Sequence, residues 1–374
     1  MYVLNAWPVS PYSAKVRAYL RFKGIPFEER APTSLELLGR IQKAVGWAVM
    51  PTIEANGEWL QDSTVIIETL EERYPEPSIT PPGPTQRVAD LLLELHGDEW
   101  LTMLAMHYRW NRPRNKAFAI DEFARYGFPR LPLFLSRLAT KRLAEKMQSY
   151  LPVLGVTPDT AAGVEGFAEA LIAQLDTHFA EHHFMLGSRP GIGDFAMFGP
   201  LWAHLYRDPA SRCLYEGAPN VRAWFERLLE PDGEPGEFLP SDEVPETLDP
   251  VFETLFAEQF AFVRDLIGKV DAYCAAHPEA TRLPRALGTN PFVVGGHPGE
   301  RKLTTYTHWM AQRSLQAYHA VEDKSVVDAW LDRVGGLQAM REPIRNPQQR
   351  RDFKMSLVSS GRARPPEPSG SAMS

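Results

Sequence analysis

The chain has few cysteines and no long apolar run, and both absences limit what it can be. Only Cys213 and Cys274 occur among 374 residues, whereas a secreted chain of this size more often carries several disulfides. No apolar run approaches the roughly 18 residues that a membrane-spanning helix needs, and the first residues lack the basic and apolar regions of an export signal. We therefore expect a cytoplasmic protein with no membrane partner.

Excess positive charge is also missing, which bears on the possible partners. The net charge is −7, while a nucleic-acid partner requires a concentrated basic surface that neutralises phosphates. Only residues 341–364 are locally basic, and acids and prolines interrupt them. We expect no nucleic-acid partner. The 44% of hydrophobic and 23% of charged residues are typical of a globular protein, and the length predicts two or three domains.

Residues 1–75 alternate between extended and helical patterns. Residues 2–6 predict a strand, and apolar residues at helical spacing continue to Lys23. Between them, Ser10 and Pro11 suit the N-cap and the first position of a helix. Such a helix end offers free N–H groups and a partial positive charge, which favour an anion or a thiolate close to the Ser10 hydroxyl. The alternative is that Ser10 is only a cap.

The rest of this region predicts a small α/β domain. Asn56-Gly57 favours a type I′ turn between two strands, since both of its central residues need a positive φ. Asp62 and Ser63 follow the second strand and can cap the next helix. Strand, helix, strand, helix, hairpin and helix give a mixed sheet covered by helices. After the first helix these elements are expected at residues 27–30, 34–46, 49–55, 58–61 and 64–74.

Beyond a proline-rich linker at residues 75–84, long helical patterns replace the alternation. An all-helical domain is expected at residues 85–230, and an acidic segment rich in proline and glycine follows it. Residues 246–343 predict a mostly helical extension with a possible β-hairpin at 290–306, and we expect disorder from Ile344 to Ser374. Helices are expected at 87–110, 133–150, 163–181, 192–207, 219–229, 250–276 and 326–340, and residues 112–132 are expected to be irregular.

Four motifs, in this order, resemble those of the glutathione transferase family. They are Ser10-Pro11-Tyr12-Ser13 after the first strand, Met50-Pro51 at the start of the third, Asp62-Ser63 before the third helix, and Gly187-Ser188-Arg189-Pro190-Gly191-Ile192-Gly193-Asp194 in the helical region. The resemblance covers roughly residues 1–230. It implies a thioredoxin-like glutathione-binding domain at 1–78 and the family's all-α domain at 85–230, with an extension similar to those of some bacterial members.

The resemblance also implies a reaction in which the glutathione sulfur attacks a small hydrophobic electrophile, as in detoxification. A free thiol has a pKa of about 8.5, so its thiolate must be stabilised near neutral pH. The serine-type members use a hydroxyl for this, which makes Ser10 the first catalytic candidate and Tyr12 the second. Both cysteine positions of a thioredoxin C-P-Y-C motif are serine here, Ser10 and Ser13, so disulfide exchange through that motif is not expected.

Glutathione, the only cofactor expected, would have two further contacts. The main chain of Met50, before an expected cis bond to Pro51, would pair with the cysteinyl unit as an added strand does. The helix that begins at Asp62 and Ser63 would hold the γ-glutamyl carboxylate. The alternatives are an ordinary edge-strand proline at Pro51 and a plain cap at Asp62.

A pocket for the electrophile is expected where the first domain meets the helix at 87–110. Its candidate lining is Trp7, Trp100, Met103, His107 and Trp110, although the same aromatic and methionine residues could form the core face of that helix. No metal site is expected, because neither His182-His183 nor His96 with Asp98-Glu99 has the spacing or the additional ligands.

One motif departs from the family pattern, and one alternative function stays open. Gly191 stands where the family commonly has Ser or Thr, so Asp194 is not expected to close a full capping box. The resemblance implies a homodimer. The alternative to a transferase is a non-catalytic scaffold or interaction protein that has the transferase fold.

Overall fold

The N-terminal region is the α/β domain that the sequence predicts. The structure is a computed structural model that describes residues 1–231, 234–351 and 353–358. A four-stranded sheet has the order β2-β1-β3-β4, with β1 and β2 parallel and the other pairs antiparallel. The strands are β1 (Tyr2–Asn5), β2 (Phe27–Arg30), β3 (Thr52–Ala55) and β4 (Glu58–Gln61). Asn56 and Gly57 both have a positive φ, as the predicted hairpin turn requires.

Helices connect and cover these strands. They are α1 (Pro11–Phe22), α4 (Ser63–Arg73) and, between β2 and β3, the consecutive segments α2 (Ser34–Glu36), η1 (Leu37–Ile41) and α3 (Gln42–Val45). The predicted helix from Ser34 to near Gly46 is confirmed, and it ends at Gly46 in the left-handed conformation.

The second region is helical, as expected. Its segments are α5 (Pro84–Leu95), η2 (His96–Trp100), α6 (Leu101–Asn111), α7 (Pro113–Gly127), α8 (Leu133–Gln148), η3 (Pro152–Leu154), α9 (Ala161–Glu181), α10 (Ile192–Pro200), η4 (Leu201–Tyr206), η5 (Arg212–Tyr215) and α11 (Pro219–Leu229). The long predicted helix is α5 and α6 joined by the π-helical segment η2. The prediction of irregular structure at 112–132 was wrong for α7. The buried positions of this helix include the polar Asn115 and Glu122, so its apolar residues do not show a clear helical spacing in the sequence.

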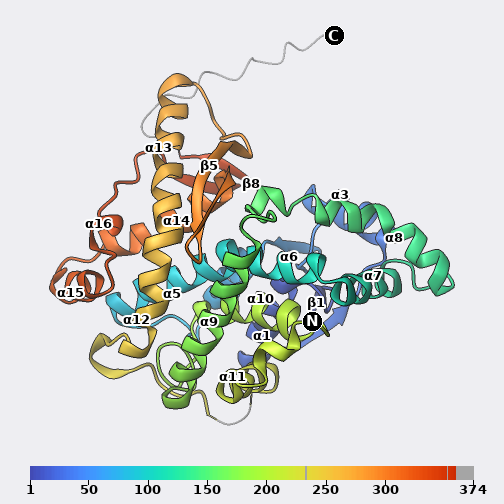
Figure 1. The fold of residues 1–374 in the computed structure, drawn as a ribbon, viewed down its shortest axis with the longest axis horizontal. Helices are drawn as coiled ribbons and strands as arrows, with labels where there is room; N and C mark the ends of the chain where they lie inside the picture. The colour runs from blue at the N-terminus through green and yellow to red at the C-terminus, as the bar shows by residue number, and fades with distance from the viewer. Residues whose placement is uncertain (232–233, 352, 359–374) are drawn as a thin grey trace.

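The extension is a mixture of helices and two hairpins. It comprises η6 (Pro240–Asp242), η7 (Glu246–Leu248), α12 (Asp249–Thr254), η8 (Leu255–Phe260), α13 (Ala261–Ala276), β5 (Ala286–Val294), β6 (His297–Thr304), α14 (Thr305–His319), α15 (Ser325–Arg333), α16 (Leu337–Met340), β7 (Gln348–Arg351) and β8 (Lys354–Leu357). It stands on one side of the molecule, in orange and red, while α7 and α8 project on the opposite side (Figure 1). Within the described residues, no helix has both the length and the apolarity needed to cross a bilayer.

Three expectations about the extension have clear outcomes. The hairpin expected near residues 290–306 is confirmed by the antiparallel pair β5 and β6. The helix expected at 326–340 is broken at Gly335, whose φ is positive, so α15 and α16 are separate. The disorder expected from Ile344 was wrong as far as residue 358, because β7 pairs with β8 and Gln348 is buried against Gln312. Residues 359–374 lie outside the described part of the chain.

The N-cap residue of the buried helix α10 is Gly191, and a carboxylate from another helix supplies the capping acceptor that glycine lacks. Asp90 of α5 accepts the main-chain N–H of Ile192 at 3.1 Å and that of Gly193 at 2.8 Å. Asp194 accepts the N–H of Gly191 at 3.0 Å. A Cβ at Gly191 would lie 2.3 Å from Oδ1 of Asp90. Asp90 thus takes the place of the missing Ser or Thr side chain, which explains the departure from the family motif.

Replacing Asp90 by alanine should therefore destabilise the fold. Two buried N–H groups would lose their acceptor, and each costs about 1–3 kcal/mol when left unpaired. We expect the free energy of unfolding, measured by urea titration, to fall by at least about 2 kcal/mol. Asp90→Asn keeps one acceptor oxygen and should recover part of the loss, while Asp159→Ala, at an exposed position, is the control. Equal stability of all three variants would contradict the capping role.

Candidate active site

The pairing of the strands brings the N-terminal motifs to one edge of the sheet. Thr52, the first residue of β3, pairs with the last residue of β1 and with the last residue of β4. The chain therefore leaves β1 toward Ser10, enters β3 from Pro51, and leaves β4 at Asp62 and Ser63, all at the same edge. The hairpin of β3 with β4 and the pairing of β3 with β1 together produce this arrangement.

Ser10 is the N-cap of α1, as expected. Its Oγ accepts the main-chain N–H of Ser13 at 3.2 Å, and its backbone is extended. A hydroxyl that accepts through a lone pair keeps its proton for another partner. Among the described residues no group accepts that proton, and the side chain of Ser10 is only partly buried. Ser10 can therefore donate a hydrogen bond to an anion at the start of α1.

Tyr12 has a different environment from Ser10. Its phenol donates to the main-chain oxygen of Asp98 at 3.0 Å. Burial, followed by the nearby charges of Glu99 and Asp98, raises the pKa of Tyr12 well above its usual value. The phenol is neutral and its proton is already bonded inside the protein. Of the two candidates for a thiolate donor, the geometry favours Ser10.

The Met50–Pro51 bond is cis, which confirms the expectation. Pro51 is buried, and Met50 is partly buried against an apolar cluster that contains Trp7 and Trp110. Met50 thus lies between the sheet edge and the helical domain.

Asp62 is the N-cap of α4, and both of its carboxylate oxygens accept hydrogen bonds. Oδ1 accepts the main-chain N–H of Thr64 at 3.1 Å and that of Val65 at 3.4 Å. Oδ2 accepts from the hydroxyl of Tyr306 and from the guanidinium of Arg350, both at 2.6 Å. The backbone of Asp62 has a φ of 85°, which is uncommon outside glycine. The cap is confirmed, and the extension supplies half of its partners.

Residues of the extension surround this edge, and sequence reasoning missed them. Arg350 also donates to the side chain of Gln61 at 2.6 Å. The guanidinium of Arg285 lies 4.4 Å from the ring centroid of Trp47. These contacts join positions more than two hundred residues apart, so no motif or local spacing could have indicated them.

A buried ion network lies immediately behind the edge. Lys15 of α1 donates to Glu94 at 2.7 Å, to Asp98 at 2.6 Å and to Thr64 at 3.1 Å. Arg313 of α14 pairs with the same Glu94. Although burial favours protonation, Arg313 and Lys15 lower the pKa of Glu94 to about 2. Burial raises the pKa of Asp98 to about 6, against the opposing effect of Lys15. The network connects α1, α4, α5 and α14.

Two of the five predicted pocket residues lie together. Trp7 and Trp110 belong to a small apolar cluster that is separate from the main core. Phe123 lies between them, with ring centroids 5.7 Å from Trp7 and 6.0 Å from Trp110. Partly buried methionines at 50, 106 and 147 pack against this cluster. It is a small apolar and aromatic lining beside the start of β3.

The other three predicted pocket residues do not lie in this cluster. Trp100 and Met103 are buried in the main core, where Arg301 of the extension covers the Trp100 ring at 4.7 Å. His107 bonds through Nε2 to Glu165 at 2.8 Å, and burial lowers its pKa. Met103 and Trp110 are seven positions apart and lie on the same side of the helix, yet Met103 packs in the main core and Trp110 in the small cluster. Helical spacing alone therefore does not tell which of these residues line one pocket.

Neither of two surface hollows includes the sheet edge. One, of about 300 Å³, is lined by residues that include His96, Phe167 and Glu258, and the other, of about 440 Å³, lies against Glu68 and Arg313. The part of the chain that the structure describes holds no cluster of three or more His, Cys, Asp or Glu residues suited to a metal.

Two stretches of the sequence match the models of a known protein family. The sequence profile described as the N-terminal domain of glutathione S-transferase matches residues 4–78, and the profile of its C-terminal domain matches residues 159–227. The chain belongs to the glutathione S-transferase family. Residues 228–374 continue beyond the second glutathione S-transferase match, so the extension is additional to the two domains of the family.

A curated relative is similar over a short stretch. It is glutathione S-transferase DHAR2 of Arabidopsis thaliana, 32% identical over 80 residues, which is 19% of this chain. The chain matches 34% of that relative, so it spans about a third of the relative's length.

Solved structures resemble the chain more distantly. The β-etherase LigF from Sphingobium sp. strain SYK-6 is 19% identical, with 61% of this chain and 94% of that chain covered and a TM-score of 0.41. A glutathione S-transferase from Methylobacterium radiotolerans, solved with glutathione sulfonate, is also 19% identical, with coverages of 65% and 99% and a TM-score of 0.40. These likenesses carry nothing about the chemistry of this chain.

Proposed function

We propose that this protein binds glutathione at the sheet edge formed by Ser10, Met50, Pro51, Asp62 and Ser63, and that it activates the thiol for attack on an apolar electrophile. The observation that carries the proposal is the Ser10 hydroxyl, which caps α1 while no group among the described residues accepts its own proton. A cytoplasmic detoxifying transferase, acting as a homodimer, is the form of this function that the family suggests.

Ser10 and the start of α1 would act together on the sulfur. The Ser10 O–H donates to the thiolate, and the partial positive charge of the helix end stabilises the same anion. Both effects lower the pKa of the bound thiol from its usual value of about 8.5. The thiolate then forms a C–S bond to the electrophile, and the leaving group departs with its electron pair. Ser10 forms no covalent intermediate.

The other end of glutathione would lie at the start of α4. The N–H groups and the Ser63 hydroxyl at this helix end suit the γ-glutamyl carboxylate. Asp62 would repel that carboxylate if its charge stood alone, but Arg350 pairs with it at 2.6 Å. Arg350 is therefore a positioning residue for glutathione in this proposal, and it comes from the extension.

The electrophile would lie against the Trp7 and Trp110 cluster. Phe123, Met50 and Met106 complete an apolar, partly flexible lining there. Trp100, Met103 and His107 are not part of the proposed lining, since they contact the main core or Glu165.

Calorimetric titration with glutathione tests the proposal. We expect one binding site per chain with a dissociation constant in the millimolar range or below, and no heat of binding at millimolar concentration would refute it. Arg350→Met should weaken binding by about tenfold, because the charge of Asp62 then faces the ligand without the cation that pairs with it. Arg351→Met, at the exposed position next to it, is the matched control and should bind as the wild type does.

A scaffold without catalysis is the second candidate, and one observation favours it. Tyr306 and Arg350 already hold the Asp62 carboxylate from the extension, so this edge has a partner within the chain. Under this alternative the titration gives no binding, and neither Arg350→Met nor Arg351→Met changes the result.

A further inference from the structure

The first half of helix α8 presents its large apolar residues to solvent, whereas small residues of the helix are buried. Ser136, Thr140 and Ala144, four positions apart, are its buried residues. Phe134 and Leu138, on another face, are 70% and 69% exposed. An amphipathic helix of a globular protein normally does the reverse, since its apolar face packs on the core. The outward face of α8 is therefore suited to an apolar environment outside this chain.

Most of the exposed apolar residues on this side of the molecule lie close together in the sequence. We define the α8 patch as the five exposed residues Leu131, Leu133, Phe134, Leu135 and Leu138. Two more exposed leucines, Leu35 and Leu38, lie on α2 and η1. Ser34 at the start of α2 lies close to the end of α7, since a Cβ at Gly127 would be 2.7 Å from its Oγ. Contiguous exposed apolar surface of this kind marks an interaction site.

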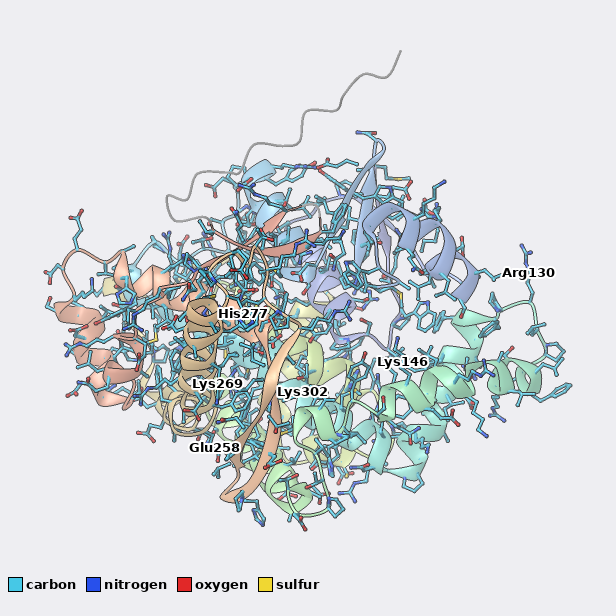
Figure 2. All side chains as sticks on the ribbon, turned by 90° about the horizontal axis from the view of Figure 1, so that it is seen from above. Arg130, Lys146, Glu258, Lys269, His277 and Lys302 are labelled. Atoms are coloured by element: carbon cyan, nitrogen blue, oxygen red, sulfur yellow. The ribbon has the colours of Figure 1, made fainter. Side chains whose placement is uncertain are left out.

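Cations surround the α8 patch, although the whole chain is acidic. Residues 129–148 contain five basic residues and one acidic residue, against a net charge of −7 for the chain. Arg137 is paired with Asp121. The other four, Arg130, Lys141, Arg142 and Lys146, are exposed, and Lys141 lies 3.9 Å from Glu145. Figure 2 shows Arg130 at the outer end of the α7 and α8 hairpin and Lys146 nearer the body of the molecule.

We propose that the α8 patch binds the surface of an anionic phospholipid bilayer. Phe134 and Leu138 would enter the interface between headgroups and acyl chains, while Lys141 and Arg142 would contact lipid phosphates. In this proposal the helix lies on the membrane and does not span it, which is compatible with the finding that no helix of the described residues is long and apolar enough to cross a bilayer. The proposal departs from the expectation of no membrane partner. The hairpin projects on the side opposite the extension, which leaves the approach to a flat surface open (Figure 1).

The charges argue against a second copy of this chain as the occupant. A twofold contact between two α8 patches would place the same cations face to face. Like charges at close range are destabilising, and an anionic lipid surface supplies the opposite sign. The proposal does not depend on glutathione binding, so each can fail without the other.

Co-sedimentation of the full chain with vesicles tests the proposal. We expect binding to mixed phosphatidylcholine and phosphatidylglycerol vesicles, weaker binding at high salt, and little binding to phosphatidylcholine alone. Phe134→Ser with Leu138→Ser should reduce the bound fraction at least about tenfold. Val326→Ser, at another exposed apolar residue, is the control and should bind normally, because it belongs to α15, on the side of the molecule opposite α8 (Figure 1).

Two results would overturn the membrane proposal. One is equal sedimentation of the double variant and the wild type, or no sedimentation of either with the anionic vesicles. The other is a wild-type dimer by light scattering that becomes a monomer in the double variant, because the patch would then be a contact between copies. Circular dichroism of the double variant checks that its helices are intact.

Discussion

Ser10→Ala should lower kcat/KM for glutathione conjugation by about a hundredfold or more, the usual effect of removing a donor to a developing anion. The variant loses the hydroxyl that can donate to the thiolate, while the N–H groups of α1 remain. It also loses the bond to the N–H of Ser13, an N-cap loss that costs about 1 kcal/mol of stability. Kinetics with a standard aromatic electrophile, together with a thermal melt, separate the two effects.

The pH dependence of this variant gives a second readout. At pH values below the usual thiol pKa of about 8.5, the wild type should hold glutathione as thiolate and the variant should not. The difference in rate should therefore shrink as the pH rises toward that value, because solvent then ionises the thiol without help. A loss caused only by the weaker helix cap would not follow this profile.

Two further variants decide between the hydroxyl candidates. Ser10→Thr keeps both the cap and the donor and should retain most of the activity. Tyr12→Phe removes a phenol that already donates to the oxygen of Asp98, so its rate should stay within a few fold of the wild type. If Tyr12→Phe loses the activity and Ser10→Ala keeps it, Tyr12 is the donor and the assignment made here is wrong.

The part of the site that depends on local pairing could be predicted from the sequence. The Asn56-Gly57 turn determines how β3 pairs with β4, and the chain enters the sheet next to Pro51 and leaves it at Asp62. Short-range rules of turns and helix caps describe such features well. The Asn56-Gly57 turn and the cap at Asp62 follow from these rules, whereas the grouping of Ser10, Pro51 and Ser63 into one site follows from the resemblance to the glutathione transferases.

The contacts from the extension could not be predicted, because they depend on packing between distant segments. Tyr306 and Asp62 are separated by 244 positions, and Asp90 replaces a cap on a helix more than a hundred residues away. The five candidate pocket residues do not all lie together, for a related reason. The spacing of Trp100 and Trp110 shows that both are on one helix, but the neighbours on each side decide which face meets the site.

The buried network around Lys15 gives the prediction with the largest expected effect on stability. Lys15 is fully buried and contacts both Glu94 and Asp98, whereas Arg313 contacts Glu94 and Glu68. Lys15→Met removes the only cation bonded to Asp98 within the described residues, so a buried carboxylate is left unpaired. Breaking a buried pair in this way costs about 3–5 kcal/mol, which we expect as a loss in the free energy of unfolding by urea.

The loss in Lys15→Met should depend on pH with a definite sign. Burial already raises the pKa of Asp98 to about 6, and Lys15 opposes that rise. Without Lys15 the native state holds a proton on Asp98 more tightly than the unfolded chain does, so the free energy of unfolding falls as the pH rises. The variant should therefore be closest to the wild type in mild acid and weakest above neutral pH.

Matched variants show whether an uncompensated charge is the cause. Asp98→Asn added to Lys15→Met removes the orphaned charge and should recover part of the stability, with a coupling energy that a double-mutant cycle measures. Lys141→Met, at an exposed position, should change stability by no more than about 0.5 kcal/mol. If Lys15→Met unfolds like Lys141→Met at every pH, the network does not hold α1 against α5. If Asp98→Asn recovers nothing, the loss comes from packing around the Lys15 side chain and not from charge.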